Sequence, residues 1–186
     1  ADTISFSEIE QLTLTDQADG VDASADNAGV NIDAGAGDDT MTFGEGDDSI
    51  TGGAGDDDLL LTEGGGVDTV SDFDLNDDDG HGFYNAQLDV SGLAGGSGIG
   101  GAVRTGDVAV ADDGFGNALL TFPGGEQLVL QGVTPAQMSS HNQLYAAGIP
   151  CFTPDVQLAT RRGAVPAGQI RVGDLLQTAD NGFQPV

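Results

Sequence analysis

Apolar residues recur at a short, nearly fixed interval through the first part of the chain. Met41, Ile50 and Leu59 are nine residues apart, with mostly polar or small residues between them. Elsewhere the interval is nine or eleven residues, which two-residue insertions at turns would explain. One inward apolar residue per interval predicts short β-strands that share a core and are wound as one continuous coil. The series is Leu12, Val21, Ile32, Met41, Ile50, Leu59 and Val70.

The residues between these apolar positions also repeat. Residues 34–60 read AGAGDDTMT, FGEGDDSIT and GGAGDDDLL, three units of the pattern G-G-x-G-x-D-x-U-x, in which U is apolar. Glycine permits left-handed backbone turns. The Asp carboxylates and exposed carbonyls are hard oxygen ligands, the type that calcium prefers. The repeat is a known signature of calcium-binding parallel β-helices, and two of its units make one full turn.

The charge of the chain limits its partners and its ability to collapse. The chain carries 31 acidic residues against four arginines, a formal net charge of −27. Self-repulsion of this size opposes a compact form unless cations neutralise it. Binding to nucleic acid or to anionic membranes is excluded, because both need basic contacts. The single cysteine excludes an intramolecular disulfide, and the chain shows neither an apolar run of membrane-spanning length nor a signal-peptide pattern at its start.

The end of the coil carries a second signature. Asp72-Phe73 is followed, after an acidic loop, by Leu88-Asp89-Val90-Ser91. With the nonapeptides, these segments make residues 12–93 similar to the RTX (repeats-in-toxin) calcium-binding proteins. The resemblance implies a parallel β-roll with calcium as cofactor, export through a type I secretion ABC transporter, and folding as a secreted or cell-surface protein. Without calcium, the alternative for this composition is a disordered acidic linker.

We expect calcium between turns, where aspartates of neighbouring turns face each other. Asp39 should pair with Asp57, and Asp48 with Asp68, with Gly carbonyls completing about six ligands. The full set of expected ligands, from the repeat and the resemblance, is Asp19, Gly35, Gly37, Asp39, Gly44, Gly46, Asp48, Gly53, Gly55, Asp57, Gly66, Asp68, Asp72 and Asp89.

The region after the coil has a different pattern. Residues 94–101 are rich in Gly and Ser and predict a linker. Residues 107–110, 118–122 and 127–130 alternate apolar and polar side chains and are separated by Gly-containing turns. This pattern predicts a small antiparallel cap over the open apolar end of the coil. A short helix is expected within residues 134–147.

The acidic loop and the two histidines have less specific patterns. Asp74, Asn76 and Asp78 alternate as at the start of an EF-hand loop, but the Gly and Glu that such a loop requires are misplaced. The loop is therefore either a further ion site or a solvated acidic turn. His81 and His141 are each expected to be ordinary exposed residues.

The last 36 residues begin a second motif at Cys151. They resemble the opening block of a bacterial Hint (hedgehog/intein) domain, with Asp155 and Arg161 in place of the usual Gly and Pro. The resemblance implies that Cys151 attacks the carbonyl of Pro150 in an N-to-S acyl shift. The activating His of such domains comes from a later block that these residues lack, so we expect an intact bond here. The matching residues are Cys151, Phe152, Thr153, Pro154, Thr160, Gly163, Val172, Gly173, Asp174, Thr178, Asp180, Gly182, Pro185 and Val186.

These observations predict an all-β protein in three parts. Residues 1–93 form the calcium-binding β-roll, residues 94–150 the β-rich cap, and residues 151–186 a truncated, Hint-type β segment. The leading function is a secreted calcium-binding structural module. The alternatives are a self-processing precursor that reacts at Cys151 and a calcium-dependent adhesin or matrix protein that self-assembles as a homo-oligomer or binds another extracellular partner. Hydrolase motifs such as H-E-x-x-H and G-x-S-x-G do not occur.

Overall fold

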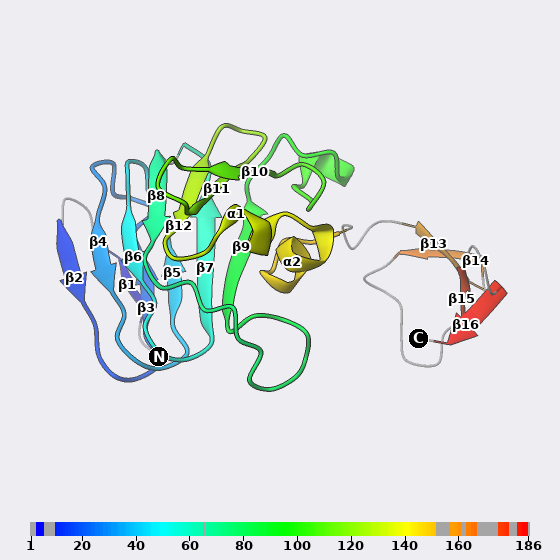
Figure 1. Ribbon diagram of the computed structural model, residues 1–186, viewed down its shortest axis with the longest axis horizontal. Helices are drawn as coiled ribbons and strands as arrows, with labels where there is room; N and C mark the ends of the chain where they lie inside the picture. Colours follow the sequence, from blue (N-terminus) through cyan, green and yellow to red (C-terminus); the bar gives the residue numbers. More distant parts are fainter. Residues whose placement is uncertain are drawn as a thin grey trace.

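The computed structural model describes residues 3–5, 10–64, 66–151, 157–160, 163–166, 175–178 and 182–185. Within these residues the protein is mostly β, and its main body is built on parallel pairing (Figure 1). Three sheets are described, and each is open, with two edge strands. Among the described residues, no helix has the length and apolar character needed to cross a membrane.

The chain passes alternately between two sheets, and each strand pairs in parallel with the strand two places on. The five-stranded sheet has the order β1-β3-β5-β7-β9, and the even-numbered strands enter the seven-stranded sheet. The strands of the first are β1 (Thr3–Ser5), β3 (Gly20–Asp22), β5 (Thr40–Thr42), β7 (Asp57–Thr62) and β9 (Ala86–Gly92); those entering the second are β2 (Gln11–Thr13), β4 (Asn31–Asp33), β6 (Ser49–Thr51) and β8 (Val67–Val70).

The predicted apolar series lies in register along both sheets. Val21, Met41 and Leu59 are direct partners on the five-stranded sheet, and each is at most 2% exposed. Ile32 and Ile50 are partners on the other sheet and are fully buried. Residues of both sheets belong to one core, where each fully buried Leu or Ile contributes about 1.5–3 kcal/mol. The structure therefore confirms the predicted inward positions.

The three alternating runs form the predicted antiparallel strands. They are β10 (Ala109–Asp112), β11 (Ala118–Thr121) and β12 (Gln127–Leu130). β12 also pairs in parallel with β8, so that Leu130 lies beside Val70. The hairpins therefore extend the seven-stranded sheet edge to edge instead of forming a separate layer over its end.

Two short helices replace the single expected helix. α1 (Pro135–Met138) and α2 (His141–Ala146) each begin with a capping box, and a 3₁₀ turn, η1 (Ile99–Gly101), lies within the predicted linker. The carbonyls of Ala146 and Ala147 accept hydrogen bonds from the backbone N–H groups of Tyr84 and Leu88. The end of α2 therefore covers the free edge of β9.

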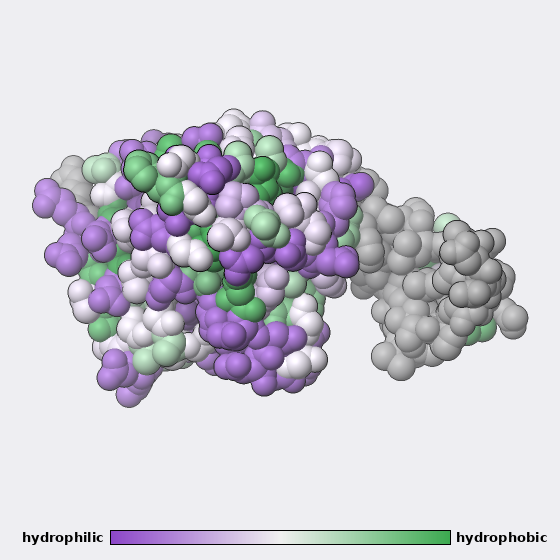
Figure 2. Space-filling model, in the orientation of Figure 1, coloured by the Kyte–Doolittle hydropathy of each residue, from purple (hydrophilic) through white to green (hydrophobic). Residues whose placement is uncertain are grey.

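The C-terminal segment forms its own antiparallel sheet, in the order β14-β13-β15-β16, and Figure 1 draws it apart from the main body. This agrees with the predicted β segment. The residues of the Hint-type pattern that lie outside the described residues are Phe152, Thr153, Pro154, Asp155, Arg161, Val172, Gly173, Asp174, Asp180 and Val186. On the main body, hydrophilic residues spread over the face drawn in Figure 2, most densely where Figure 1 draws the loop between β8 and β9. The strands are β13 (Gln157–Thr160), β14 (Gly163–Pro166), β15 (Leu175–Thr178) and β16 (Gly182–Pro185).

Candidate metal centre

The predicted aspartate pairs lie on neighbouring turns and are joined through the backbone. Asp57 Oδ1 accepts a hydrogen bond from the N–H of Asp39 at 3.1 Å, and Asp39 Oδ1 accepts one from the N–H of Asp19 at 2.7 Å. In the second series, Asp68 Oδ1 accepts from the N–H of Asp48 at 3.0 Å. The structure therefore stacks aspartates of successive turns in two columns: Asp19, Asp39 and Asp57 form the first, and Asp48 and Asp68 form the second.

These carboxylates are buried without a basic partner. Asp39, Asp48, Asp57 and Asp68 are each at most 4% exposed, and Asp39 Oδ2 has no hydrogen-bond partner. The one ion pair within the described residues joins His81 to Asp79, away from both columns. Burying a carboxylate that lacks a compensating charge is strongly unfavourable. A cation within each column would remove this penalty.

Burial shifts the titration of the same groups. Desolvation raises the pKa of Asp57 to about 6 and that of Asp68 to about 7, and it also raises the pKa of Asp39 and Asp48. Because these folded-state pKa values exceed the ordinary 3.8, ionisation removes stability from the cation-free fold as the pH rises from about 4 to about 7. Bound protons or bound cations in the columns would offset this loss at neutral pH.

Glycines allow the turns to stack closely. Gly53 and Gly55 lie directly over Gly35 and Gly37, since a Cβ at either would fall within 2.0 Å of the carbonyl oxygen below. Gly44 and Gly66 have ordinary φ values, but a Cβ at each would also fall within 2.3 Å of a neighbouring oxygen. The predicted ligand glycines with positive φ are Gly35, Gly37, Gly46, Gly53 and Gly55.

The remaining predicted aspartates have different surroundings. Asp19 continues the first column, and hydrogen bonds from Thr15 lower its pKa. Asp72 Oδ1 accepts a hydrogen bond from the N–H of Gly52, and Asp72 Oδ2 accepts one from the N–H of Gly53. Both carboxylate oxygens therefore bind the turn at Gly52 and Gly53. Asp89 is exposed on β9 and accepts from the N–H of Ser91. The charge of Asp72 lies close enough to the Asp57 carboxylate to raise its pKa, after the larger effect of burial. The roles of Asp72 and Asp89 as calcium ligands stay predictions.

In each column, two neighbouring turns together contribute two aspartate carboxylates. Within the part of the chain that the structure describes, no group of three or more His, Cys, Asp or Glu side chains is arranged to hold a metal ion. Calcium accepts backbone carbonyl oxygens and water as well as carboxylates. A calcium ion here would therefore take most of its ligands from the glycine-rich turns.

Sequence reasoning missed Glu126. This side chain is 6% exposed, its Oε2 has no hydrogen-bond partner, and its Oε1 accepts only a long 3.4 Å bond from the N–H of Gly64. Because β12 pairs with β8, Glu126 lies at the turn that follows β7, where a further coil turn would otherwise continue. The signal was the Gly124-Gly125 pair one residue before β12, which resembles the two glycines at the start of a repeat unit.

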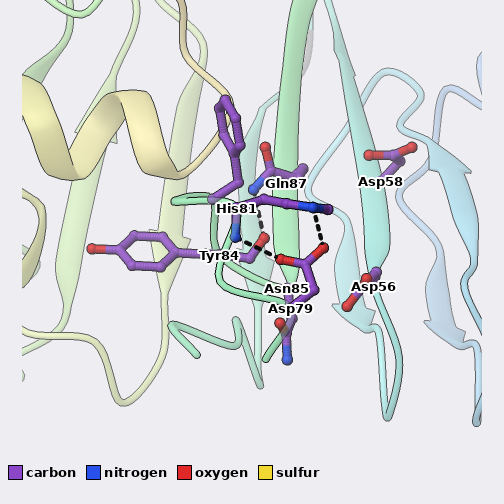
Figure 3. A pocket seen from close by; sticks show the side chains of 8 residues that line it. Asp56, Asp58, Asp79, His81, Tyr84, Asn85 and Gln87 are labelled. Atoms are coloured by element: carbon purple, nitrogen blue, oxygen red, sulfur yellow. Dashed lines mark hydrogen bonds and ion pairs between the residues drawn. The ribbon is translucent and has the colours of Figure 1, made fainter. Parts of the chain in front are cut away.

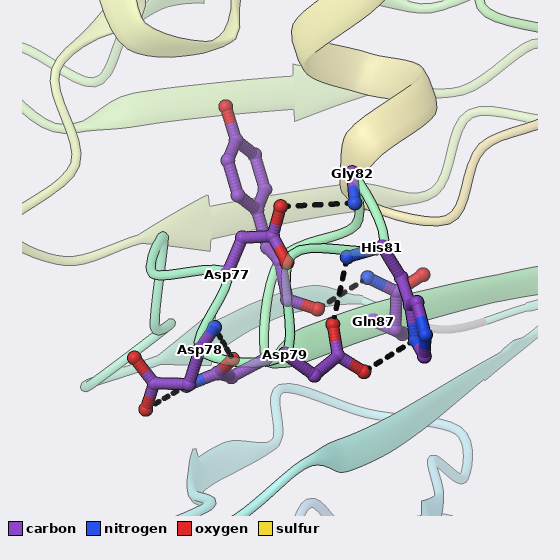
Figure 4. Close-up of polar contacts among 8 residues, drawn as sticks. Asp77, Asp78, Asp79, His81, Gly82 and Gln87 are labelled. Atoms are coloured by element: carbon purple, nitrogen blue, oxygen red, sulfur yellow. Dashed lines mark hydrogen bonds and ion pairs between the residues drawn. The ribbon is translucent and has the colours of Figure 1, made fainter.

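The acidic loop satisfies its own carboxylates. Asp79 pairs with the His81 ring at 2.6 Å and accepts from the His81 N–H, and Asp77 accepts from the N–H of Gly82 (Figure 4). Figure 3 shows the loop facing Asp56 and Asp58 across a cavity of about 230 Å³. His81 is exposed, as predicted. The loop is organised by local hydrogen bonds, and a second ion there stays a prediction.

Cys151 is the last described residue before the C-terminal sheet. Its thiol is exposed, and its Sγ lies 3.8 Å from Thr105 Oγ1. The backbone N–H of Thr105 donates to the carbonyl oxygen of Pro150 at 3.0 Å. The predicted nucleophile is thus in contact with residues before it in the chain.

Comparison with known proteins found no matching family model, curated protein or solved structure.

Proposed function

We propose that residues 12–93 form an RTX-type β-roll that folds on binding calcium and serves as a structural module of a secreted protein. The observation that carries this proposal is the stacking of buried aspartates on neighbouring turns without a basic partner among the described residues. Calcium between the turns supplies the missing charge and joins each turn to the next. Export through a type I ABC transporter follows from the RTX resemblance.

The charge of the chain supports a coupled mechanism. With a net charge of −27, the metal-free chain repels itself. Metal sites whose ligands come together only in the folded state convert binding free energy into folding free energy. A chain of this kind stays unfolded where calcium is scarce and folds where calcium is abundant, which suits secretion in an unfolded state.

Removing one carboxylate should weaken calcium-driven folding. Asp57→Asn keeps the size and the hydrogen-bond acceptor of the side chain but deletes a charge from the first column. We expect the calcium concentration at the folding midpoint to rise about tenfold, equal to about 1.4 kcal/mol. Asp33→Asn is the matched control, because Asp33 is exposed on β4 and loses the same charge. Circular dichroism measures the calcium concentration at the folding midpoint of each variant. Equal midpoints for the two variants would count against calcium at Asp57.

A second candidate function is self-processing at Cys151. The hydrogen bond from Thr105 to the Pro150 carbonyl favours it, because the contact fixes the bond that the thiol would attack. The prediction of an intact Pro150–Cys151 bond considered only the residues after Cys151. Thr105 and His141 come before Cys151 in the chain, and Thr105 contacts the side chains of both His141 and Cys151. If this candidate is correct, incubation with a small thiol cleaves the chain between residues 150 and 151, and Cys151→Ala prevents the cleavage. Intact mass measurement shows whether the chain is cleaved. An uncleaved wild-type chain would rule out self-processing at Cys151. The calcium-dependent adhesin stays a prediction.

A further inference from the structure

The segment before β10 and the start of α2 enclose a cavity of about 320 Å³ beside Cys151. It is lined by Ser97, Arg104, Thr105, Gly106, His141 and Cys151. These residues come from three separate parts of the sequence, and they combine a thiol, a hydroxyl, an imidazole and a guanidinium group. The cavity is distinct from the aspartate columns of the coil.

A buried hydroxyl connects the two reactive side chains at this cavity. Thr105 Oγ1 donates to Cys151 Sγ at 3.8 Å and lies 3.1 Å from His141 Nδ1. Thr105 is 5% exposed, whereas Cys151 and His141 are exposed. The hydroxyl is thus shielded from water, while the thiol remains open to reagents. A nucleophile joined to a base in this way is the arrangement that activates a thiol.

We propose that Cys151, Thr105 and His141 form a reactive-thiol site, in which His141 takes the thiol proton through the Thr105 hydroxyl. The thiol proton moves from Sγ to Oγ1, and the hydroxyl proton moves from Oγ1 to Nδ1. The products are a thiolate and an imidazolium, so the total charge is unchanged. In this state the imidazolium donates to Oγ1, and Oγ1 donates to the sulfur, which is the direction of the hydrogen bond described above.

Neighbouring groups hold this relay in place. The N–H of Thr105 donates a hydrogen bond to the carbonyl of Pro150, the residue directly before Cys151, at 3.0 Å, so the backbone at the thiol is held beside Thr105. Ser140 caps α2 directly before His141, accepting from the N–H of Gln143. Arg104 is the only Lys or Arg before Cys151, and its Nε is buried without a hydrogen-bond partner. The charge of Arg104 is shared with Asp107, which interacts with it electrostatically and accepts a hydrogen bond from its backbone N–H at 3.0 Å.

The thiolate would react with small carbon electrophiles. With iodoacetamide, a bond forms between Sγ and the methylene carbon, iodide leaves with the electron pair, and the proton remains on His141. The site would also serve the second candidate function. In that step Sγ bonds to the carbonyl carbon of Pro150, the C–N bond breaks, and the Cys151 nitrogen takes the proton from His141. The thiol reactivity itself does not depend on this step.

The test is the rate at which iodoacetamide alkylates Cys151 in the full chain, with calcium at neutral pH, followed by intact mass. We expect Thr105→Val and His141→Gln each to lower the rate at least about tenfold, the scale of general-base assistance. The double variant should be no slower than the slower single variant, because both residues act in one relay. Thr105→Ser, which keeps the hydroxyl, should retain most of the rate.

Two controls separate activation from folding. His81→Gln removes an exposed histidine that pairs with Asp79 and should react as the wild type does. All variants should react at one common rate in denaturant, where the relay is absent. Single-variant rates within twofold of wild type in calcium would overturn the proposal. If calcium leaves the fold unchanged but His141→Gln still slows alkylation, the thiol site stands and the calcium proposal fails.

Discussion

Chelation of calcium is expected to convert residues 12–93 from ordered β-structure to disordered chain. In the metal-free state, four aspartates at most 4% exposed would have to be buried as charges or bind protons at a cost. Before Cys151 the sequence offers a single Lys or Arg, Arg104, against these charges. We therefore expect the loss to be cooperative and to remove most of the β-signal, an effect on the scale of the whole folding free energy.

Circular dichroism during titration with EDTA, and again during return of calcium, measures this effect. Magnesium is the matched control, because it demands a tighter octahedral site and holds its water strongly. It should restore little of the signal at the same concentration. A β-signal that persists in EDTA at low salt and neutral pH would show that the aspartate columns need no metal ion.

The repeat made most of the main fold predictable. Each nine-residue unit carries one large apolar residue, so the partners on neighbouring turns could be read from spacing alone. Met41 pairs with Leu59 eighteen positions on, whereas Val21 pairs with Met41 after twenty, as the insertion predicts. The aspartate columns follow from the same spacing, because a carboxylate at a fixed place in each unit must stack once the strands are in register.

Contacts between distant segments were not predictable, because no local pattern encodes them. The three runs after the coil indicated hairpins, but nothing in them showed that β12 would join β8 in parallel and bury Glu126. Likewise, Thr105 lies 46 residues from Cys151 and 36 from His141. The residues after Cys151 lack the histidine of a Hint domain, and no local pattern indicated that His141, ten residues before Cys151, would lie 3.1 Å from Thr105.

Replacing Gly53 with alanine should be far more harmful than the same change at Gly114. Both residues have left-handed backbones, with φ of 99° and 94°, so an alanine is strained at either one. At Gly114, in the turn between β10 and β11, nothing lies within 4 Å of the new Cβ. At Gly53 the Cβ would fall 1.8 Å from the carbonyl oxygen of Gly35. The backbone of one coil turn would then have to separate from the next.

We expect Gly114→Ala to cost about 1–2 kcal/mol, the usual penalty for a left-handed alanine, and Gly53→Ala to cost at least about 4 kcal/mol. The difference isolates turn stacking, because the backbone strain is shared. Urea unfolding of both variants in saturating calcium gives the two free energies. The turn at Gly53 also carries the Asp57 carboxylate that follows it, so separation of the turns should raise the calcium requirement as well. Equal losses for the two variants would mean that the coil turns are not packed as closely as their glycines indicate.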